Sequence, residues 1–200
     1  TVNIDNATIS GTIAGSGPPM IFLHAGVADR RMWRPQIDAL KEHHTVVAYD
    51  RRGFGETKAT DEPFSHLAAL VAVMGHLDLT KATLVGSSQG GRIAIDFALT
   101  YPDSVVALAL LAPAVSGAPG PSDFPPEIQA LDEALDEADE ADDLDRINAI
   151  EAHMWLDGPT SPEGRVSGEV RELFLDMTGI ARRMPDLEQE VEPASAYGRV

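Results

Sequence analysis

A serine flanked by glycines stands in the stretch TLVGSSQGGR, residues 83–92. The pattern G-x-S-x-G fits only when it is centred on Ser88, because for Ser87 the first glycine position is occupied by Val85. An apolar run ends just before this serine, and an amphipathic pattern begins at Gln89. This order predicts a tight strand-to-helix turn that holds Ser88 in a strained backbone conformation with its oxygen projecting above a sheet. Ser88 is therefore a candidate nucleophile.

A serine hydroxyl needs an adjacent base, normally a histidine that is oriented by a carboxylate. Only one histidine follows Ser88, and this residue, His153, lies in the helical pattern AIEAHMWLDGP rather than after a strand. Nor does a carboxylate stand near the end of the apolar run in LLAPAVSG. The remaining candidates precede the serine and do not follow a predicted strand end: His43, His44, His66 and His76. The sequence thus predicts a nucleophile without a recognisable base or acid in this chain.

The elements that must position Ser88 alternate between short apolar runs and amphipathic patterns. The apolar runs predict buried strands at 20–24, 45–50, 82–87 and 105–113, preceded by an antiparallel pair at 1–4 and 7–15. Helical spacing predicts helices at 31–43, 64–77 and 89–101, the first with Asp29 as its N-cap. Strands and helices in this order favour an α/β fold with a doubly wound, mostly parallel sheet.

The pattern changes after Pro113. A segment rich in proline, glycine and serine reads AVSGAPGPSDFPPE, and strand-poor helical sequence follows to about residue 192. We predict a core at 1–117, a helical cap at 118–195 and a return to the core at 196–200. Met154 and Trp155 add large apolar surface to the cap, where they are candidates for lining a substrate pocket.

The net charge of −17 is concentrated in the predicted cap. Between residues 118 and 195, acidic side chains outnumber basic ones by 21 to 5. Such a surface repels phosphate backbones, so we expect no nucleic-acid partner. The acidic run at 132–145 predicts a solvated helix face, with a docking surface for a basic partner as the alternative, and it lacks the glycine and spacing of a calcium-binding EF-hand loop.

The composition of the chain limits its possible cross-links, its metal sites and its expected location in the cell. The absence of cysteine excludes disulfides and thiolate metal sites. No apolar run approaches the roughly 20 residues that span a bilayer, and the first residues lack the pattern of a signal peptide. We therefore expect a cytoplasmic protein without a membrane partner.

Three ordered stretches resemble the α/β-hydrolase family. FLHAGVADRRMW is similar to the His-Gly loop that follows the third strand of the family, and YDRRGFGET is similar to the Asp-x-Arg-Gly-x-Gly loop after the fourth. LVGSSQGGRIAIDFALTYPDSVVALALLAP resembles the nucleophile elbow with its following helix and strand. The resemblance begins near residue 8 and reaches the end of the sequence.

The resemblance implies roles for individual residues. Ser88 would attack a carbonyl carbon, and backbone N–H groups of Gln89 and Gly26 would form the oxyanion hole. Ala25 departs from the family, which commonly has glycine there. His24 would brace the oxyanion loop rather than act as a base. Asp50, Arg51 and Arg52 are interpreted as a hydrogen-bonded turn that packs the loops.

The implied function is a serine hydrolase that acts on an ester, a lactone or a related small carbonyl substrate through an acyl-enzyme, with no metal or organic cofactor. The alternative is a non-catalytic ligand-binding or interaction protein that keeps the fold. Because the family supplies the acid and the histidine on later strands, we expect a truncated chain. The strand predicted at 105–113 would then lie at the edge of the sheet. An unpaired edge of this kind predicts self-association or pairing with a complementing C-terminal segment.

Overall fold

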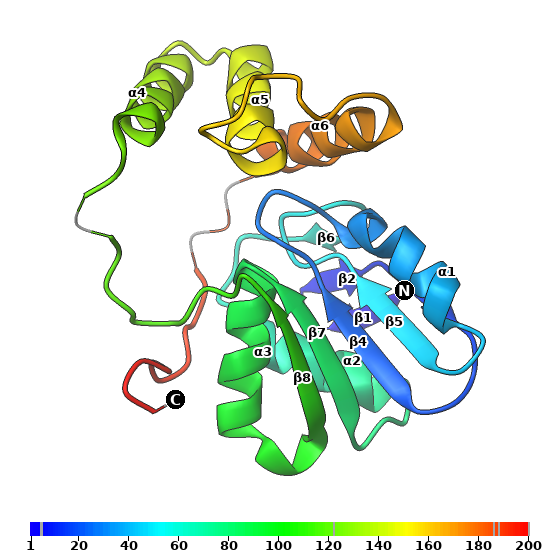
Figure 1. Cartoon of the computed structure of the whole chain (residues 1–200). Helices are drawn as coiled ribbons and strands as arrows, with labels where there is room; N and C mark the ends of the chain where they lie inside the picture. The colour runs from blue at the N-terminus through cyan, green and yellow to red at the C-terminus, as the bar shows by residue number, and fades with distance from the viewer. Residues whose placement is uncertain (5, 122, 186, 188, 200) are drawn as a thin grey trace. The chain divides into compact units, whose positions relative to one another are not determined.

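The computed structural model describes residues 1–200 except 5, 122, 186, 188 and 200. The chain forms two compact units (Figure 1): a core unit of residues 1–118 and 185–200, and a helical unit of residues 119–184. Ala118 and the described residues of 185–195, which the sequence analysis assigned to the cap, are grouped with the core unit. Asp186, Glu188 and Val200, which that division assigned to the cap and to the return, lie outside the described residues.

A five-stranded sheet forms the centre of the core unit, in the order β3-β5-β4-β7-β8. Its strands are β3 (Gly11–Ala14), β4 (Pro19–Leu23), β5 (Thr45–Tyr49), β7 (Ala82–Ser87) and β8 (Val105–Leu111). Strand β4 runs parallel to both β5 and β7, and β7 runs parallel to β8, whereas β3 is antiparallel to β5. The prediction of a mostly parallel α/β sheet is confirmed.

The N-terminal residues divide between two sheets. β1 (Val2–Ile4) pairs antiparallel with β2 (Ala7–Ile9), as predicted, and the short β6 (Lys58–Ala59) extends that pair. The rest of the predicted second strand, β3, instead joins the main sheet. The chain changes sheets at Ser10, whose N–H donates to Thr57 Oγ1 and whose carbonyl accepts from the Asp50 N–H.

Helices cover both faces of the main sheet. α1 (Arg34–Leu40) follows a 3₁₀ turn (Arg30–Trp33), and the Asp29 side chain caps that turn by accepting from the Arg31 N–H. α2 (His66–His76) is capped in the same way by Ser65, and α3 (Gln89–Thr100) follows β7 directly. A second 3₁₀ turn (Pro102–Ser104) leads into β8.

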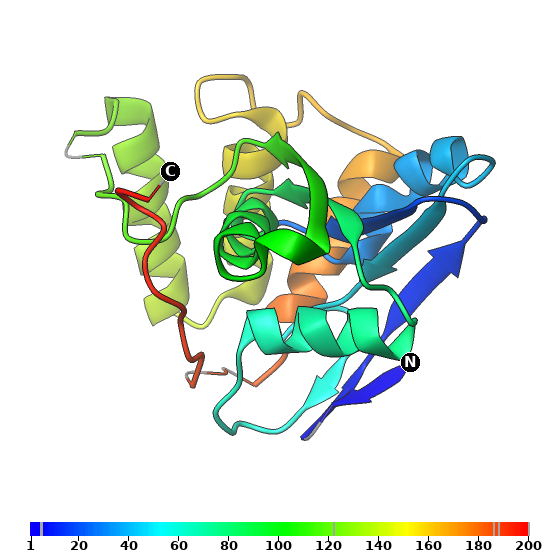
Figure 2. The same ribbon diagram turned by 90° about the horizontal axis from the view of Figure 1, so that it is seen from below.

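Two apolar layers follow from the alternation of side chains along the strands. Ile21 and Leu23 of β4 pack with α2 and α3, whereas Phe22 between them packs with Trp33 and Ile37 on the opposite face. Figures 1 and 2 show α1 and α2 on opposite faces of the sheet. Burial of each large apolar side chain stabilises the fold by about 1.5–3 kcal/mol, so both layers hold the sheet between its helices.

Strand β8 lies at one edge of the sheet, and its apolar side chains are accessible. Val106 is 65% exposed and Leu111 is 48% exposed. An unpaired, apolar edge of this kind is a site where another strand can add. Self-association through it stays a prediction.

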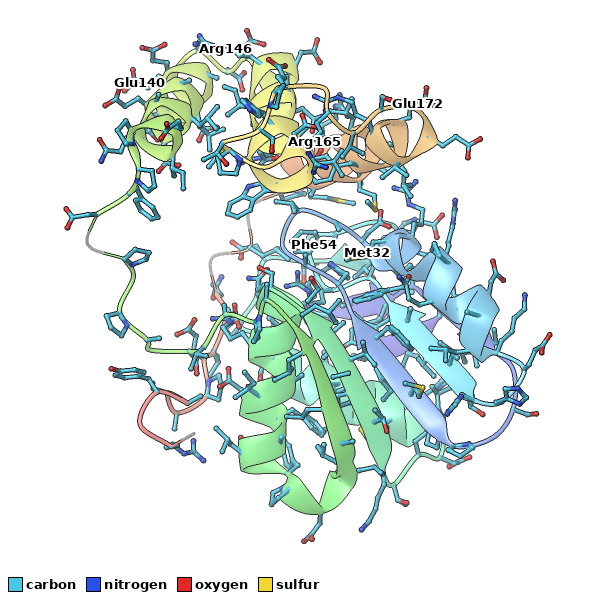
Figure 3. All side chains as sticks on the ribbon, viewed as in Figure 1. Met32, Phe54, Glu140, Arg146, Arg165 and Glu172 are labelled. Atoms are coloured by element: carbon cyan, nitrogen blue, oxygen red, sulfur yellow. The ribbon has the colours of Figure 1, made fainter. Side chains whose placement is uncertain are left out.

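The helical unit contains α4 (Pro126–Glu140), α5 (Leu144–Ala152), a π-helical turn (His153–Asp157) and α6 (Glu169–Arg182). α5 packs against both α4 and α6. Figure 3 shows charged side chains of this unit, including Glu140, Arg146 and Glu172, pointing away from the helix axes, and all three are exposed. Within the described residues, none of the helices in either unit combines the length and apolar character needed to cross a bilayer.

Candidate active site

The turn between β7 and α3 holds Ser88 in a rare backbone conformation. Its φ of 50° and ψ of −115° lie where side chains other than glycine are strained. The Ser88 N–H donates to the Leu111 carbonyl at 3.0 Å, and the Ser88 carbonyl accepts from the N–H groups of Arg92 at 3.0 Å and Ala114 at 3.1 Å. These three hydrogen bonds to α3 and to the end of β8 fix the strained turn.

The Ser88 side chain is left available by this turn. Ser88 is the N-cap of α3, yet within the described part of the chain its hydroxyl makes no capping hydrogen bond to that helix. The residue is also exposed. A hydroxyl at a helix N-terminus, unused by the backbone, can attack an incoming group where developing negative charge is favoured.

Close backbone contacts explain the glycines around Ser88. A Cβ atom on Gly86 would lie 2.5 Å from the Gly90 carbonyl oxygen, and one on Gly90 would lie 2.2 Å from the Leu23 carbonyl oxygen. Neither backbone oxygen can move away as a side chain could. The glycines therefore let the first turn of α3 press against both β7 and the end of β4.

His24, directly after β4, is fully buried and uses both of its ring nitrogens. Its Nε2 accepts the Arg51 N–H at 3.0 Å, so Nδ1 carries the proton and donates to the Ala25 carbonyl at 2.8 Å. Burial, reinforced by the charge of Arg51, holds the pKa of His24 well below its usual value. A neutral histidine engaged at both nitrogens braces the loop, as expected, and is unsuited to act as the base.

Asp50, directly after β5, ties its own loop together. Its carboxylate accepts from the N–H groups of Arg30 and Glu56, both at 2.9 Å, and forms an ion pair with the Arg30 guanidinium. The Asp50 side chain is fully buried. The interpretation of this residue as part of a hydrogen-bonded turn is consistent with these contacts. We call residues 24–29 and 50–57, which follow β4 and β5, the strand-end loops.

The two arginines after Asp50 are buried on aromatic rings, which the sequence did not indicate. The Arg52 guanidinium lies 5.4 Å from the centre of the Phe64 ring, and that of Arg51 lies 4.5 Å from the centre of the Phe54 ring. Phe54 is labelled in Figure 3. Arg51 also donates from Nη1 to Gln89 Oε1 at 2.9 Å, so it reaches the residue next to Ser88.

The structure brings Gly26 against Gln89. A Cβ atom on Gly26 would lie 3.1 Å from Gln89 Oε1. The N–H of Gln89 belongs to the first turn of α3, where N–H groups have no partner within the helix. Within the described residues, the Gly26 N–H donates no hydrogen bond either. Two backbone donors are thus left available on the segments that adjoin Ser88.

A chain segment that returns from the helical unit lies along α3. Arg92 forms ion pairs with Glu190 at 3.1 Å and Glu192 at 2.7 Å. One turn further along α3, buried Asp96 accepts from the Ser116 hydroxyl at 2.6 Å, and that hydroxyl in turn accepts from the Ala196 N–H at 2.8 Å. The sequence analysis missed these contacts because their partners lie far apart along the chain.

Within the described residues, the remaining histidines form no hydrogen bond with Ser88. His66 is buried, and burial together with the charges of Arg51 and Arg92 lowers its pKa well below the usual value. His43 and His44 precede β5 and so lie at the opposite end of the parallel strands from the elbow. Within the described residues, three or more His, Asp or Glu side chains do not gather in a group that could hold a metal ion.

His153 and the two predicted pocket residues, Met154 and Trp155, lie in the helical unit. His153 Nε2 is 2.9 Å from the Ser161 carbonyl, which occupies one ring nitrogen within that unit. Met154 and Trp155 lie on the π-helical turn, where Trp155 is 62% exposed. A part for Met154 and Trp155 in substrate binding stays a prediction.

The chain is similar to known proteins in both sequence and structure. Residues 18–163 match a family described as alpha/beta hydrolase fold. The chain is 30% identical over 196 residues to the AB hydrolase superfamily protein YisY of Bacillus subtilis strain 168, a match that covers 88% of this chain and 70% of YisY. It is 33% identical over 118 residues to a fluoroacetate dehalogenase of a Burkholderia species, covering 55% of this chain and 39% of the dehalogenase.

A solved structure, that of a thermophilic esterase from Thermogutta terrifontis, is 25% identical and superposes with a TM-score of 0.61. That superposition covers 86% of this chain and 64% of the esterase. Several curated relatives are matched over only about two-fifths of their own length.

Proposed function

The chain belongs to the alpha/beta hydrolase fold family, and on that premise we propose that it is a serine hydrolase in which Ser88 attacks an ester, a lactone or a related small carbonyl substrate. The observation that carries this proposal is the Ser88 turn itself. A strained, exposed serine at a helix N-terminus, with its hydroxyl unused for capping, is a costly arrangement that an attacking oxygen requires.

The two available N–H groups support the proposed type of substrate. Attack on a carbonyl carbon moves negative charge onto the carbonyl oxygen, which backbone N–H groups stabilise when they point at it beforehand. Gly26 and Gln89 carry such groups next to Ser88. Similar proteins include both an esterase and a dehalogenase by name. We assign ester or lactone cleavage because an oxyanion forms at a carbonyl.

The reaction would proceed through a covalent intermediate. Ser88 Oγ would form a bond to the carbonyl carbon, and its proton would pass through a general base to the departing alkoxide. Water would then cleave the acyl-enzyme and release the acid. His24 is not assigned as that base because both of its ring nitrogens are engaged. Met154 and Trp155 stay candidates for substrate binding, as predicted from the sequence.

A second candidate function is binding without turnover. It is favoured by the placement of His153, the only histidine after Ser88 in the sequence, which contacts the Ser161 carbonyl within the helical unit. A protein that kept the elbow but lacked an activated base would bind a carbonyl ligand and leave it intact.

Covalent labelling separates the two functions. The purified protein is incubated with a serine-directed fluorophosphonate and analysed by intact mass spectrometry, together with the variants Ser88→Ala and Ser87→Ala. The proposal expects one adduct on the wild type and on Ser87→Ala, and none on Ser88→Ala. Ser87 is the matched control because it is the adjacent serine in the same stretch.

Either negative result is informative. A folded wild type that takes up no adduct would contradict the hydrolase and favour the binding protein. Labelling that persists in Ser88→Ala would place the reactive serine elsewhere. Circular dichroism of each variant verifies that it is folded.

A further inference from the structure

Among the described residues, Arg51 is the largest side chain that is fully buried, and it donates hydrogen bonds to uncharged groups of Gln89 and Ala25. Burying an unpaired guanidinium costs far more than burying an apolar side chain of the same volume. Its Nε has no hydrogen-bond partner within the described residues. Burial lowers the pKa of Arg51 to about 10, so it remains charged at neutral pH. A turn that only packed loops would not need this charge.

The Arg51 guanidinium joins two segments that come from different strands. Nη1 donates to Gln89 Oε1 at 2.9 Å, and Nη2 donates to the Ala25 carbonyl at 3.2 Å. Gln89 follows the elbow serine, and Ala25 belongs to the loop after β4. The face of the guanidinium is covered by the Phe54 ring. Arg51 thereby fixes the separation of the two segments.

The Ala25 carbonyl lies within hydrogen-bond distance of three donors. These are His24 Nδ1 at 2.8 Å, Arg51 Nη2 at 3.2 Å and the Ala28 N–H at 3.3 Å. The peptide that joins Ala25 to Gly26 is planar and trans, so its carbonyl and its N–H point in opposite directions. Holding the carbonyl therefore directs the Gly26 N–H away from Arg51.

We propose that Arg51 is a positioning residue for the oxyanion hole: by holding the Ala25 carbonyl and the Gln89 side chain, it aims the Gly26 N–H at the oxyanion that forms on attack by Ser88. This inference rests on the proposed hydrolase function and extends it. The charge adds to the effect, because a buried cation next to the segments that carry both N–H donors favours negative charge there.

The test compares Arg51→Met with Arg51→Lys, and uses Arg34→Met as control because Arg34 is an exposed arginine of the same unit. Hydrolysis of p-nitrophenyl acetate and the rate of fluorophosphonate labelling are measured. Loss of one oxyanion donor typically lowers the rate by about 10²–10³. We expect Arg51→Met to lower kcat by about 10- to 100-fold with KM changed less than threefold, a smaller loss for Arg51→Lys, and none for Arg34→Met.

A readout independent of turnover is the ¹H–¹⁵N resonance of the Gly26 amide. We expect it to shift in Arg51→Met, whereas a residue needed only for packing would lower the melting temperature and leave both this resonance and kcat unchanged. A folded Arg51→Met with wild-type kcat and an unmoved Gly26 resonance overturns the inference. If Arg51→Met does not fold, Gln89→Met removes the Nη1 contact alone, and unchanged kcat in it and in Arg51→Lys overturns the inference as well.

The two proposals fail in distinguishable ways. A wild type that fluorophosphonate does not label contradicts the hydrolase function, whatever Arg51 does. A wild type that is labelled, with Arg51→Met labelled at the same rate, retains the hydrolase function and removes Arg51 from it.

Discussion

The strand-end loops of the core unit and the helices of the helical unit place their charges in opposite ways. In the loops, His24, Asp50 and Arg51 are at most 1% exposed and are joined to neighbouring segments by hydrogen bonds. In the helical unit, the acidic side chains from Glu133 to Asp145 are exposed to solvent. Buried polar networks fix one geometry, because any member left without a partner is costly, whereas exposed charges contribute little.

This difference indicates where the molecule tolerates change. The loops must hold the N–H donors and Ser88 in place, so their polar groups are interlocked. Among the described residues, the helical unit buries fewer ionisable side chains than the core unit does. Asp157 is the clearest buried one in the helical unit. Its carboxylate accepts from the N–H groups of Gly164 and Val166 and pairs with Arg171, each at 2.8 Å. We therefore expect mutational effects to be large beside the elbow and small on the acidic surface.

The largest effect is expected at Gly90. In Gly90→Ala, the new methyl group would lie 2.2 Å from the Leu23 carbonyl oxygen, and backbone atoms would have to move. We expect the free energy of unfolding of the core unit to fall by about 3 kcal/mol or more, measured by urea titration. Gly75→Ala is the control in the same unit, because no atom beyond the chain neighbours and the helix's own backbone lies within 4 Å of the added group there. Equal stability of the two variants would show that the elbow is not tightly packed.

Acid should affect the two units in different pH windows. The pKa values of His24 and His66 are lowered by burial, so the folded core keeps them neutral while the unfolded chain binds their protons below about pH 6.5. The free energy of unfolding of the core unit therefore decreases as the pH is lowered below about 6.5, by about 1.4 kcal/mol per pH unit for each histidine. Trp33 is the one tryptophan of the core unit, and Trp155 is that of the helical unit. In a Trp155→Phe variant, the fluorescence of Trp33 therefore reports the unfolding of the core unit.

In a Trp33→Phe variant, the fluorescence of Trp155 reports the unfolding of the helical unit. We expect this unit to lose stability only at lower pH. The N–H of Val166, together with Arg171 and Gly164, lowers the pKa of Asp157 to about 2. Because this is below the ordinary value, the stability that the carboxylate provides is present above about pH 4 and is lost as pH falls towards 2. Acid unfolding of both units in a single transition near pH 6 would contradict the comparison.

A substitution at Asp157 sharpens the same point. Asp157→Asn keeps the shape of the side chain but removes the charge that faces Arg171. We expect a lower melting temperature of the helical unit at pH 7, and a smaller loss of its stability between pH 4 and 2 because the contribution of the Asp157 carboxylate is gone. The core unit, read by Trp33, should be unchanged. A shift of the Trp33 transition would mean that the units are coupled in stability.

The smallest effect is expected on the acidic surface. Glu140 is exposed, and Figure 3 shows its side chain pointing away from the helix. We expect Glu140→Gln and Glu133→Gln each to change the free energy of unfolding by less than about 0.5 kcal/mol. A clear loss of stability in either variant would overturn the interpretation of this run as a solvated helix face.

Much of the fold could be predicted because its signals are local. Apolar runs and helical spacing gave β4, β5, β7 and β8 and the helices between them, since side-chain period depends on neighbouring residues. The exception near the N-terminus is instructive. β3 was expected in the N-terminal pair with β2, yet it adds to β5, because strand pairing is decided by which edge is free rather than by the strand's own residues.

The sequence by itself determined that Ser88 would lie on a strand-to-helix turn, since the glycines that permit such a turn are neighbours of the serine. The partners of the buried charges were decided only by the tertiary structure. Arg51 and Gln89 are 38 positions apart, and Arg92 and Glu190 are 98 apart. Arg51 and Gln89 meet because the sheet places the ends of β5, β4 and β7 side by side, whereas Arg92 and Glu190 meet because the segment after the helical unit pairs with Phe64 beside α2. The partners of the buried Arg51 guanidinium therefore could not be predicted before the fold was known.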